Sequence, residues 1–233
     1  MKARVLQHIK PISKKDQVIE MIKGAMLSGK MEPGEPIVEN RVAHDLGVGT
    51  PLVREALIEL EHQGFVQKFP YKGTYVTKFS PGDIENIFNL RIELESLALQ
   101  WAKKNATPDD IEALRKLAQG MKEGADGMKL DRFYENDIAF HRKLWEISGN
   151  PYLVDTLERL VVPLFAFFLM RNDRDRENYL ESADDHFHFI ESLPALDGAE
   201  LRKVVNESMS RWKNEMLSRL FPEKVDSNSR ALA

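Results

Sequence analysis

Three residues in the second half of the chain have the types and spacing to hold a metal ion or an anionic ligand. Asp137 and His141 are four positions apart, so both lie on one face of a predicted helix, and the other residues of that face are apolar. His186 is in phase with the apolar residues of a later predicted helix and should also point inward. Burying a carboxylate and an imidazole is costly unless something compensates for the lost hydration. A coordinated metal ion would do so, and so would an internal hydrogen bond between the Asp and a His.

A buried cation is expected near the same cluster. Arg91 falls between Ile87 and Leu94 on the side of its predicted helix that should face the core. Its guanidinium could bind the carboxylate of a ligand through two hydrogen bonds. The alternative is a salt bridge with Glu95, four residues further on.

A second candidate site, near the N-terminus, has the chemistry of nucleic-acid recognition. Thr50 and Arg54 share one face of a predicted helix, opposite its apolar stripe. Arg54 could bind a guanine or a phosphate, and the free amides at the start of this helix also favour phosphate. Lys72 and Gly73 form the tip of a predicted hairpin, which suits the DNA backbone or the minor groove. The alternative is that Arg54 and Lys72 are ordinary solvated surface charges.

The elements around these residues predict a mainly α protein with two domains. Residues 1–79 contain three predicted helices and then a β-hairpin, which together form a winged helix-turn-helix. Residues 80–221 carry only helical patterns and are expected to form a bundle of six or seven helices. Residues 222–233 are polar and predict a flexible tail.

Bulk composition excludes several classes of protein. Hydrophobic residues make up 42% of the 233 and charged residues 30%, which is typical of soluble globular proteins. We expect no membrane association and no secretion signal, because no apolar run has the required length. The absence of cysteine excludes disulfides and thiolate metal sites and fits a cytoplasmic protein. Residues 1–79 carry a net charge of +3 and the remainder −7, within a total of −4, so charge alone does not decide the partner.

The N-terminal motif resembles the DNA-binding domain of the GntR family. The resemblance rests on Gly47-Val48, on Val53-Arg-Glu-Ala-Leu57 and on Gly73-Thr-Tyr-Val76. It implies contacts with a double-stranded DNA operator, which we assign to Asn40, Arg41, Gly49, Thr50, Arg54, Lys72 and Gly73.

This chain departs from the family pattern at the positions that usually read bases. Gly49 stands where the family usually has Ser, and Thr50 stands where it usually has an Arg. Asn40 replaces another Arg that often contacts DNA. One guanine contact, worth about 1–3 kcal/mol, is therefore missing or replaced, and a typical family operator should not be assumed.

Residues 83–220 resemble the effector domain of the FadR-type branch of this family, the all-helical FCD domain. The resemblance rests on Asp137-x-x-x-His141, on Gly149-Asn-Pro151 and on Asp185-His186. It implies one divalent metal ion (Zn, Ni or Mn) held by Asp137, His141, His186 and a fourth His, whose position here is Ser208. At most three of the four ligands are therefore retained. Two alternatives remain: a three-ligand ion with open positions, or a metal-free pocket in which His and Arg bind the anion directly.

The residues and the resemblance together predict a homodimeric, ligand-responsive transcriptional repressor. The effector is expected to be a small carboxylate, bound by Arg91, Asp137, His141, His186 and Ser208. One alternative is a constitutive dimeric DNA-binding protein with a purely structural helical domain. Another is a metal-dependent enzyme, but Ser208 lies mid-helix without a nucleophile elbow, and the chain has no phosphate-binding loop and no His-Glu-x-x-His motif. We therefore do not expect an enzyme.

Overall fold

The computed structural model describes residues 13–171 and 176–222, and the chain divides into two compact units, Met1–Thr77 and Lys78–Ala233. The boundary expected from the sequence lies after residue 79. Apart from residue 222, the predicted tail falls outside the described residues. Each unit is described by itself below.

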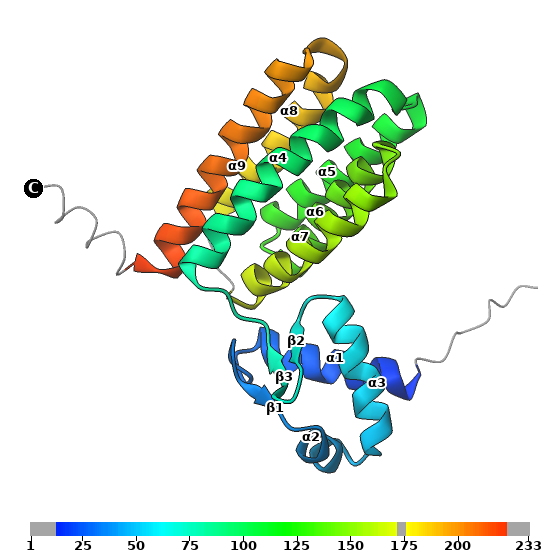
Figure 1. Ribbon diagram of the computed structural model, residues 1–233, viewed down its shortest axis with the longest axis vertical. Helices are drawn as coiled ribbons and strands as arrows, with labels where there is room; N and C mark the ends of the chain where they lie inside the picture. The colour runs from blue at the N-terminus through cyan, green and yellow to red at the C-terminus, as the bar shows by residue number, and fades with distance from the viewer. Residues whose placement is uncertain (1–12, 172–175, 223–233) are drawn as a thin grey trace, which may run out of the picture. The chain divides into compact units, whose positions relative to one another are not determined.

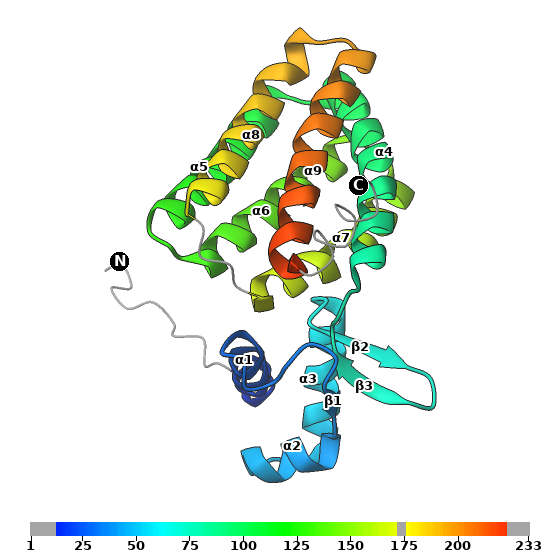
Figure 2. The same ribbon diagram turned by 90° about the vertical axis from the view of Figure 1, so that its left-hand side faces the viewer.

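The described residues of the N-terminal unit form three helices and a small sheet, whose arrangement is shown in Figures 1 and 2. Its elements, in order, are α1 Lys14–Leu27, β1 Pro36–Ile37, α2 Glu39–Leu46, α3 Thr50–His62, β2 Val66–Phe69 and β3 Gly73–Val76. A capping box starts α1, in which Ser13 and Asp16 bond each other's backbone N–H. Gly47 ends α2 in the left-handed conformation (φ 64°), which glycine adopts without strain. The predicted helix-turn-helix and wing are confirmed.

The sheet contains one strand more than the sequence predicts. Pro36 and Ile37 lie outside the predicted hairpin and pair antiparallel with Tyr75 and Thr74. The strand order is therefore β1-β3-β2. A strand of two residues is too short to show an alternating pattern, which is why the sequence did not reveal it.

The C-terminal unit is all-helical among the described residues, and its six helices confirm the predicted bundle. They are α4 Pro81–Asn105, α5 Pro108–Asp126, α6 Leu130–Ile147, α7 Pro151–Arg171, α8 Arg176–Ala195 and α9 Gly198–Leu220. Ser80, Thr107 and Asp197 each close a capping box at the start of a helix. No described helix is both long and apolar enough to cross a lipid bilayer.

Helix α6, which carries Asp137 and His141, is held closely against α5. A Cβ built on Gly124 of α5 would lie 2.7 Å from the backbone nitrogen of Phe133, so only glycine allows this approach. Helix α5 also packs on α8, while α4 packs on α6, α7 and α9 (Figure 1). This packing brings the candidate site residues of α4, α6 and α8 together inside the bundle.

The inward face of α4 carries two charged residues. It buries Arg91, as the sequence predicts, together with Phe88, Glu95 and Leu99. The apolar Leu90 lies outside this face and is 55% exposed. Arg91 and Glu95 can lie in the core because they bond to each other and to other buried polar groups.

Candidate functional site

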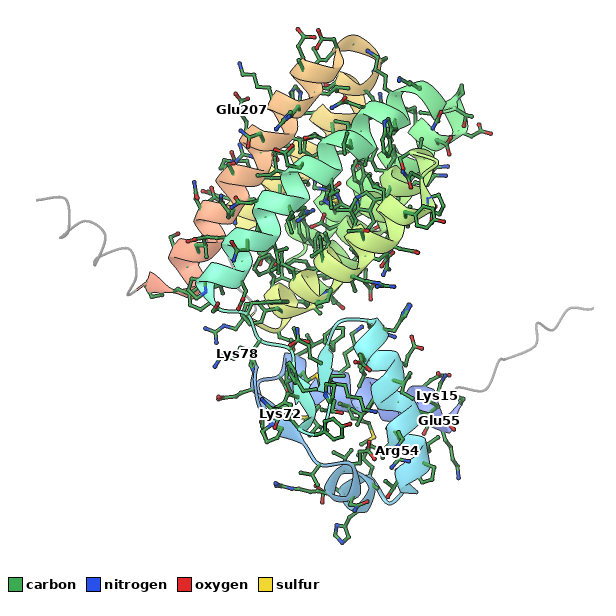
Figure 3. The ribbon with its side chains drawn as sticks, viewed as in Figure 1. Lys15, Arg54, Glu55, Lys72, Lys78 and Glu207 are labelled. Atoms are coloured by element: carbon green, nitrogen blue, oxygen red, sulfur yellow. The ribbon has the colours of Figure 1, made fainter. Side chains whose placement is uncertain are left out.

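Helices α2 and α3 present an exposed polar face in the N-terminal unit. Arg54 lies on α3 (Figure 3), and 57% of its side chain is exposed. Asn40 and Arg41 on α2 are also exposed, and Thr50 at the start of α3 is half-buried. Gly49 precedes α3 without a side-chain cap, so the first amides of the helix are not satisfied by a capping side chain. The predicted recognition residues of the two helices thus share one accessible region.

Two bonds join these helices at that face. The Nε and Nη2 atoms of Arg54 both donate to Oε2 of Glu39, at 3.1 and 2.8 Å. The hydroxyl of Thr50 donates to Oδ1 of Asn40 at 3.1 Å. The bond to Glu39 raises the pKa of Arg54, so this guanidinium stays charged. The amide nitrogen of Asn40 and the outer edge of Arg54 remain available for a partner.

The predicted wing is the hairpin of β2 and β3, which extends from the helices in Figure 2. Lys72, labelled in Figure 3, is exposed at its tip. Gly73 has a φ of 102°, a conformation that only glycine adopts readily. The tip also exposes Tyr71, which the sequence analysis did not single out.

In the C-terminal unit the structure brings Asp137, His141 and His186 together. The distance from Asp137 Oδ1 to His186 Nε2 is 3.1 Å, and from Asp137 Oδ1 to His141 Nε2 it is 3.5 Å. The two Nε2 atoms are 3.4 Å apart. All three residues are buried. We call them the buried triad.

Arg91 extends the buried triad into a network with α4. Its Nη2 donates to Nε2 of His141 at 2.8 Å, so this histidine nitrogen acts as an acceptor and carries no proton. Its Nε donates to Glu95 at 3.1 Å, which is the salt bridge that was left open as an alternative. Glu95 also accepts a bond of 2.8 Å from Nε1 of Trp145. Glu95 and Trp145 are members of the network that the sequence analysis did not name as site residues.

The charges of the network fit this arrangement. Burial alone would raise the pKa of Glu95, but its contacts with His141, Arg91 and Trp145 lower it. Burial lowers the pKa of His141, which keeps the ring neutral. Burial would also lower the pKa of His186, but the adjacent carboxylate of Asp137 raises it. The site thus holds the charged pair Arg91–Glu95 beside an Asp–His pair.

The donor set of the buried triad fits a divalent metal ion. Bonds of about 2.1 Å place the ligand atoms about 3.0–3.4 Å apart in octahedral or tetrahedral geometry, close to the three distances of the buried triad. Two imidazoles and one carboxylate suit Zn, Ni or Mn. Asp137 Oδ1 is buried without a hydrogen bond of acceptable geometry, so it has capacity for a ligand. Arg91 engages the lone pair of His141 that an ion would need, so an ion and Arg91 compete for that nitrogen.

Comparison with known proteins identifies the family to which both units belong. Residues 86–211, more than half of the chain, match the FCD domain, and residues 14–76 match the bacterial regulatory proteins of the gntR family. The chain belongs to the GntR family. Members with an FCD domain are DNA-binding transcription factors and not enzymes.

Individual relatives of this GntR-family chain are distant. The uncharacterized HTH-type regulator Rv0043c of Mycobacterium tuberculosis is 26% identical over 166 residues, covering 70% of this chain and 67% of the relative. The HTH-type transcriptional repressor RspR of Escherichia coli is 28% identical over 144 residues, covering 62% of this chain and 63% of RspR. The chain thus spans about two thirds of the length of the curated relatives it matches.

A solved structure supports the shared fold. Escherichia coli McbR/YncC superimposes with a TM-score of 0.69 at 22% identity, covering 90% of this chain and 100% of that chain. At this identity the likeness shows the fold alone.

Ser208, the position where the GntR-family resemblance implies a fourth metal ligand, does not join the buried triad. Its hydroxyl donates to Oδ2 of Asp185 at 2.7 Å, and Arg211 binds the same oxygen. Within the described residues no bond is recorded between Ser208 and the buried triad. The structure therefore groups Arg91, Asp137, His141 and His186 and leaves Ser208 in a separate polar contact.

Proposed function

We propose that this GntR-family chain is a dimeric transcriptional repressor whose DNA affinity responds to a small carboxylate. The observation that carries the proposal is the presence, in one chain, of an exposed recognition face on α3 and a buried triad joined to Arg91. The name of its relative RspR, a repressor, supports the direction of regulation. Such a protein acts on DNA in the cytoplasm.

The test of this function begins with in vitro selection of a duplex operator by the wild-type protein from a random library. The selected duplex is then titrated with the protein in the presence of short mono- and dicarboxylates. A carboxylate that weakens binding supports the proposal. A selected operator whose binding no carboxylate alters would favour the constitutive DNA-binding protein instead.

Dimerisation follows from the need for selectivity and from an apolar face on α4. One winged domain binds too few base pairs to select a site, whereas a two-fold dimer reads a palindromic operator. Leu90 and Leu97 of α4 are exposed, and Leu94 between them is half-buried. These residues share one face, and covering it with a second copy would remove apolar area from water.

The response to a ligand is proposed to arise at the buried triad. The guanidinium of Arg91 lies beside the buried triad, and a bound ion or, in a metal-free pocket, a protonated His186 would add positive charge for a carboxylate. Phe140 and Phe165 pack against the two histidine rings, so a ligand enters only by displacing groups that now touch. That displacement would favour one arrangement of the helices over another, and only such a difference can change DNA affinity.

A divalent ion is proposed to bind through Asp137, His141 and His186, with open positions for the carboxylate of the effector. We expect Asp137→Asn to weaken the binding of Zn²⁺, Ni²⁺ or Mn²⁺ by at least about tenfold, because the amide keeps the size but loses the charge. Isothermal titration of EDTA-treated protein with each ion measures this. Asp131→Asn, at an exposed position of the same helix, is the control. Wild-type protein that takes up none of the three ions would support the metal-free pocket.

The carboxylate response is expected to depend on His186. His186→Ala should leave operator affinity within about twofold of wild type, because the residue is not on the DNA-binding unit. It should also reduce the effect of the active carboxylate on that affinity by at least about tenfold, since one bidentate or charged contact is worth more than 1.4 kcal/mol. Fluorescence anisotropy with and without the carboxylate measures both. His188→Ala, an exposed histidine two residues away, is the control; equal responses in the two variants would remove the assignment.

A further inference from the structure

The tip of the β2–β3 hairpin holds an aromatic side chain entirely in solvent. The relative exposure of Tyr71 is 110%, the highest of the exposed large hydrophobic residues. Among the described residues it makes no recorded hydrogen bond, ion pair or ring contact. The ring therefore adds nothing to the packing of the free protein.

The backbone at Tyr71 is strained as well. Its φ is 63°, in the left-handed region. Lys72 N–H donates to the carbonyl of Phe69 at 3.1 Å, which makes Tyr71 the third residue of a four-residue turn. Pro70 precedes it, and a turn with Pro second and a positive φ third is of type II, where Gly is the usual third residue. A tyrosine there is strained by its Cβ, so folding alone would favour glycine.

The tip is nevertheless held in one conformation. The Phe69 and Tyr75 rings meet edge to face with centroids 5.7 Å apart. The hydroxyl of Tyr75 donates to the carbonyl of Lys72 at 3.1 Å. These contacts fix the backbone of the turn, so the position from which the Tyr71 side chain projects is set before any partner binds.

The charge around the ring indicates the kind of partner. Lys68 and Lys72 on either side are exposed, and residues 66–76 contain no Asp or Glu. An exposed aromatic ring between two lysines suits a polyanion that also offers apolar surface. Duplex DNA does so in its minor groove, where the sugars line the walls and proteins insert apolar side chains.

We infer that Tyr71 enters the DNA minor groove beside the major-groove site of α3, with its ring against the sugars and its hydroxyl bonded to a base-edge acceptor. This inference rests on the proposed function and adds a specificity-determining residue to it. The floor of the groove offers only acceptors at A·T pairs, whereas the amino group of guanine projects into it at G·C pairs. The wing should therefore prefer A·T pairs.

The experiment compares full-length wild type with Tyr71→Gly on the duplex selected by the wild-type protein. Glycine relieves the turn strain, so the variant should melt at or above the wild-type temperature. Its operator affinity should fall on the order of tenfold, and hydroxyl-radical footprints should lose protection at the wing positions. Tyr152→Ala removes another exposed tyrosine, on α7, and should change neither property.

Base-pair replacements at the wing positions separate groove contact from a general effect. For wild type, A·T→G·C should lower affinity, while A·T→inosine·C should not, because inosine lacks the amino group in the minor groove. Tyr71→Gly should not distinguish the two replacements. Equal affinity and footprint for wild type and Tyr71→Gly would overturn the inference but not the proposed function. Loss of self-association in the variant, without a change of protection in the minor groove, would have the same meaning. If wild type selects no duplex at all, the inference and the proposed function both fail.

Discussion

Arg54→Ala is expected to lower operator affinity about 10- to 100-fold, the largest effect of any single side chain on the recognition face. A good arginine contact with guanine is worth about 1–3 kcal/mol. The expected loss is a net value, because Arg54 must exchange part of its bond with Glu39 for the DNA. Fluorescence anisotropy on the selected operator at several salt concentrations measures both the affinity and its salt dependence.

The control for this variant is Arg202→Ala. Arg202 is exposed to the same degree, 57%, and is also paired with a glutamate, Glu93, but it lies in the helical unit. It should leave operator affinity unchanged. Arg54→Ala should also reduce the slope of log affinity against log salt by about one if the arginine binds phosphate. If Arg54→Ala and Arg202→Ala have the same operator affinity and the same salt dependence, Arg54 is only a solvated charge.

Glu95→Ala is expected to destabilise the helical unit by about 3–5 kcal/mol, the largest stability effect we predict. The change leaves the buried guanidinium of Arg91 without its counter-charge, and breaking a buried pair on one side costs this much. It also leaves the indole N–H of Trp145 unbonded. All three tryptophans, at 101, 145 and 212, lie in the helical unit, so urea denaturation followed by tryptophan fluorescence reports on this unit.

Glu93→Ala provides the matched comparison, two residues away on the same helix. Glu93 is 54% exposed in its pair with Arg202, and such surface pairs contribute about 0–1 kcal/mol. Its midpoint in urea should therefore stay close to wild type. If Glu95→Ala unfolds at the same urea concentration as Glu93→Ala, the buried network is not essential to the bundle.

The sequence predicts the fold well because the elements carry local signals. Ser80 and Thr107 each precede a proline and an acidic residue, which marks the start of a helix without reference to the rest of the chain. Gly47 likewise marks the turn between α2 and α3. The two-residue strand β1 has no such signal, since only its pairing with β3 makes it a strand.

The candidate site could be predicted only in part. Asp137, His141 and His186 were expected inward because their helices are amphipathic, and the structure places them together. Glu95 was considered only as a partner of Arg91, because a glutamate in a mixed helical pattern normally indicates the exposed face. Its burial depends on bonds from Arg91 on its own helix and from Trp145 on α6, and the second joins residues 50 positions apart, which no local pattern contains.

The recognition face shows the same limit. Thr50 and Arg54 are positioned by the helical repeat, which the sequence shows. Their bonds to Asn40 and Glu39 join residues 10 and 15 positions apart, and these depend on the angle between two helices. Tyr71 escaped notice because a tyrosine in a turn gives no sign of its φ, which only the coordinates reveal.

The close contact at Gly124 affects how freely the members of the buried triad can move relative to one another. With no room for even a methyl group between α5 and α6, these helices behave as one stiff block that carries Asp137 and His141. His186 lies on α8, a separate helix that also packs on α5. The distance between His186 and the other two members of the buried triad therefore depends on how α8 lies against this block, so under the proposed function a shift of α8 would change the site and a bound group would hold α8 in place.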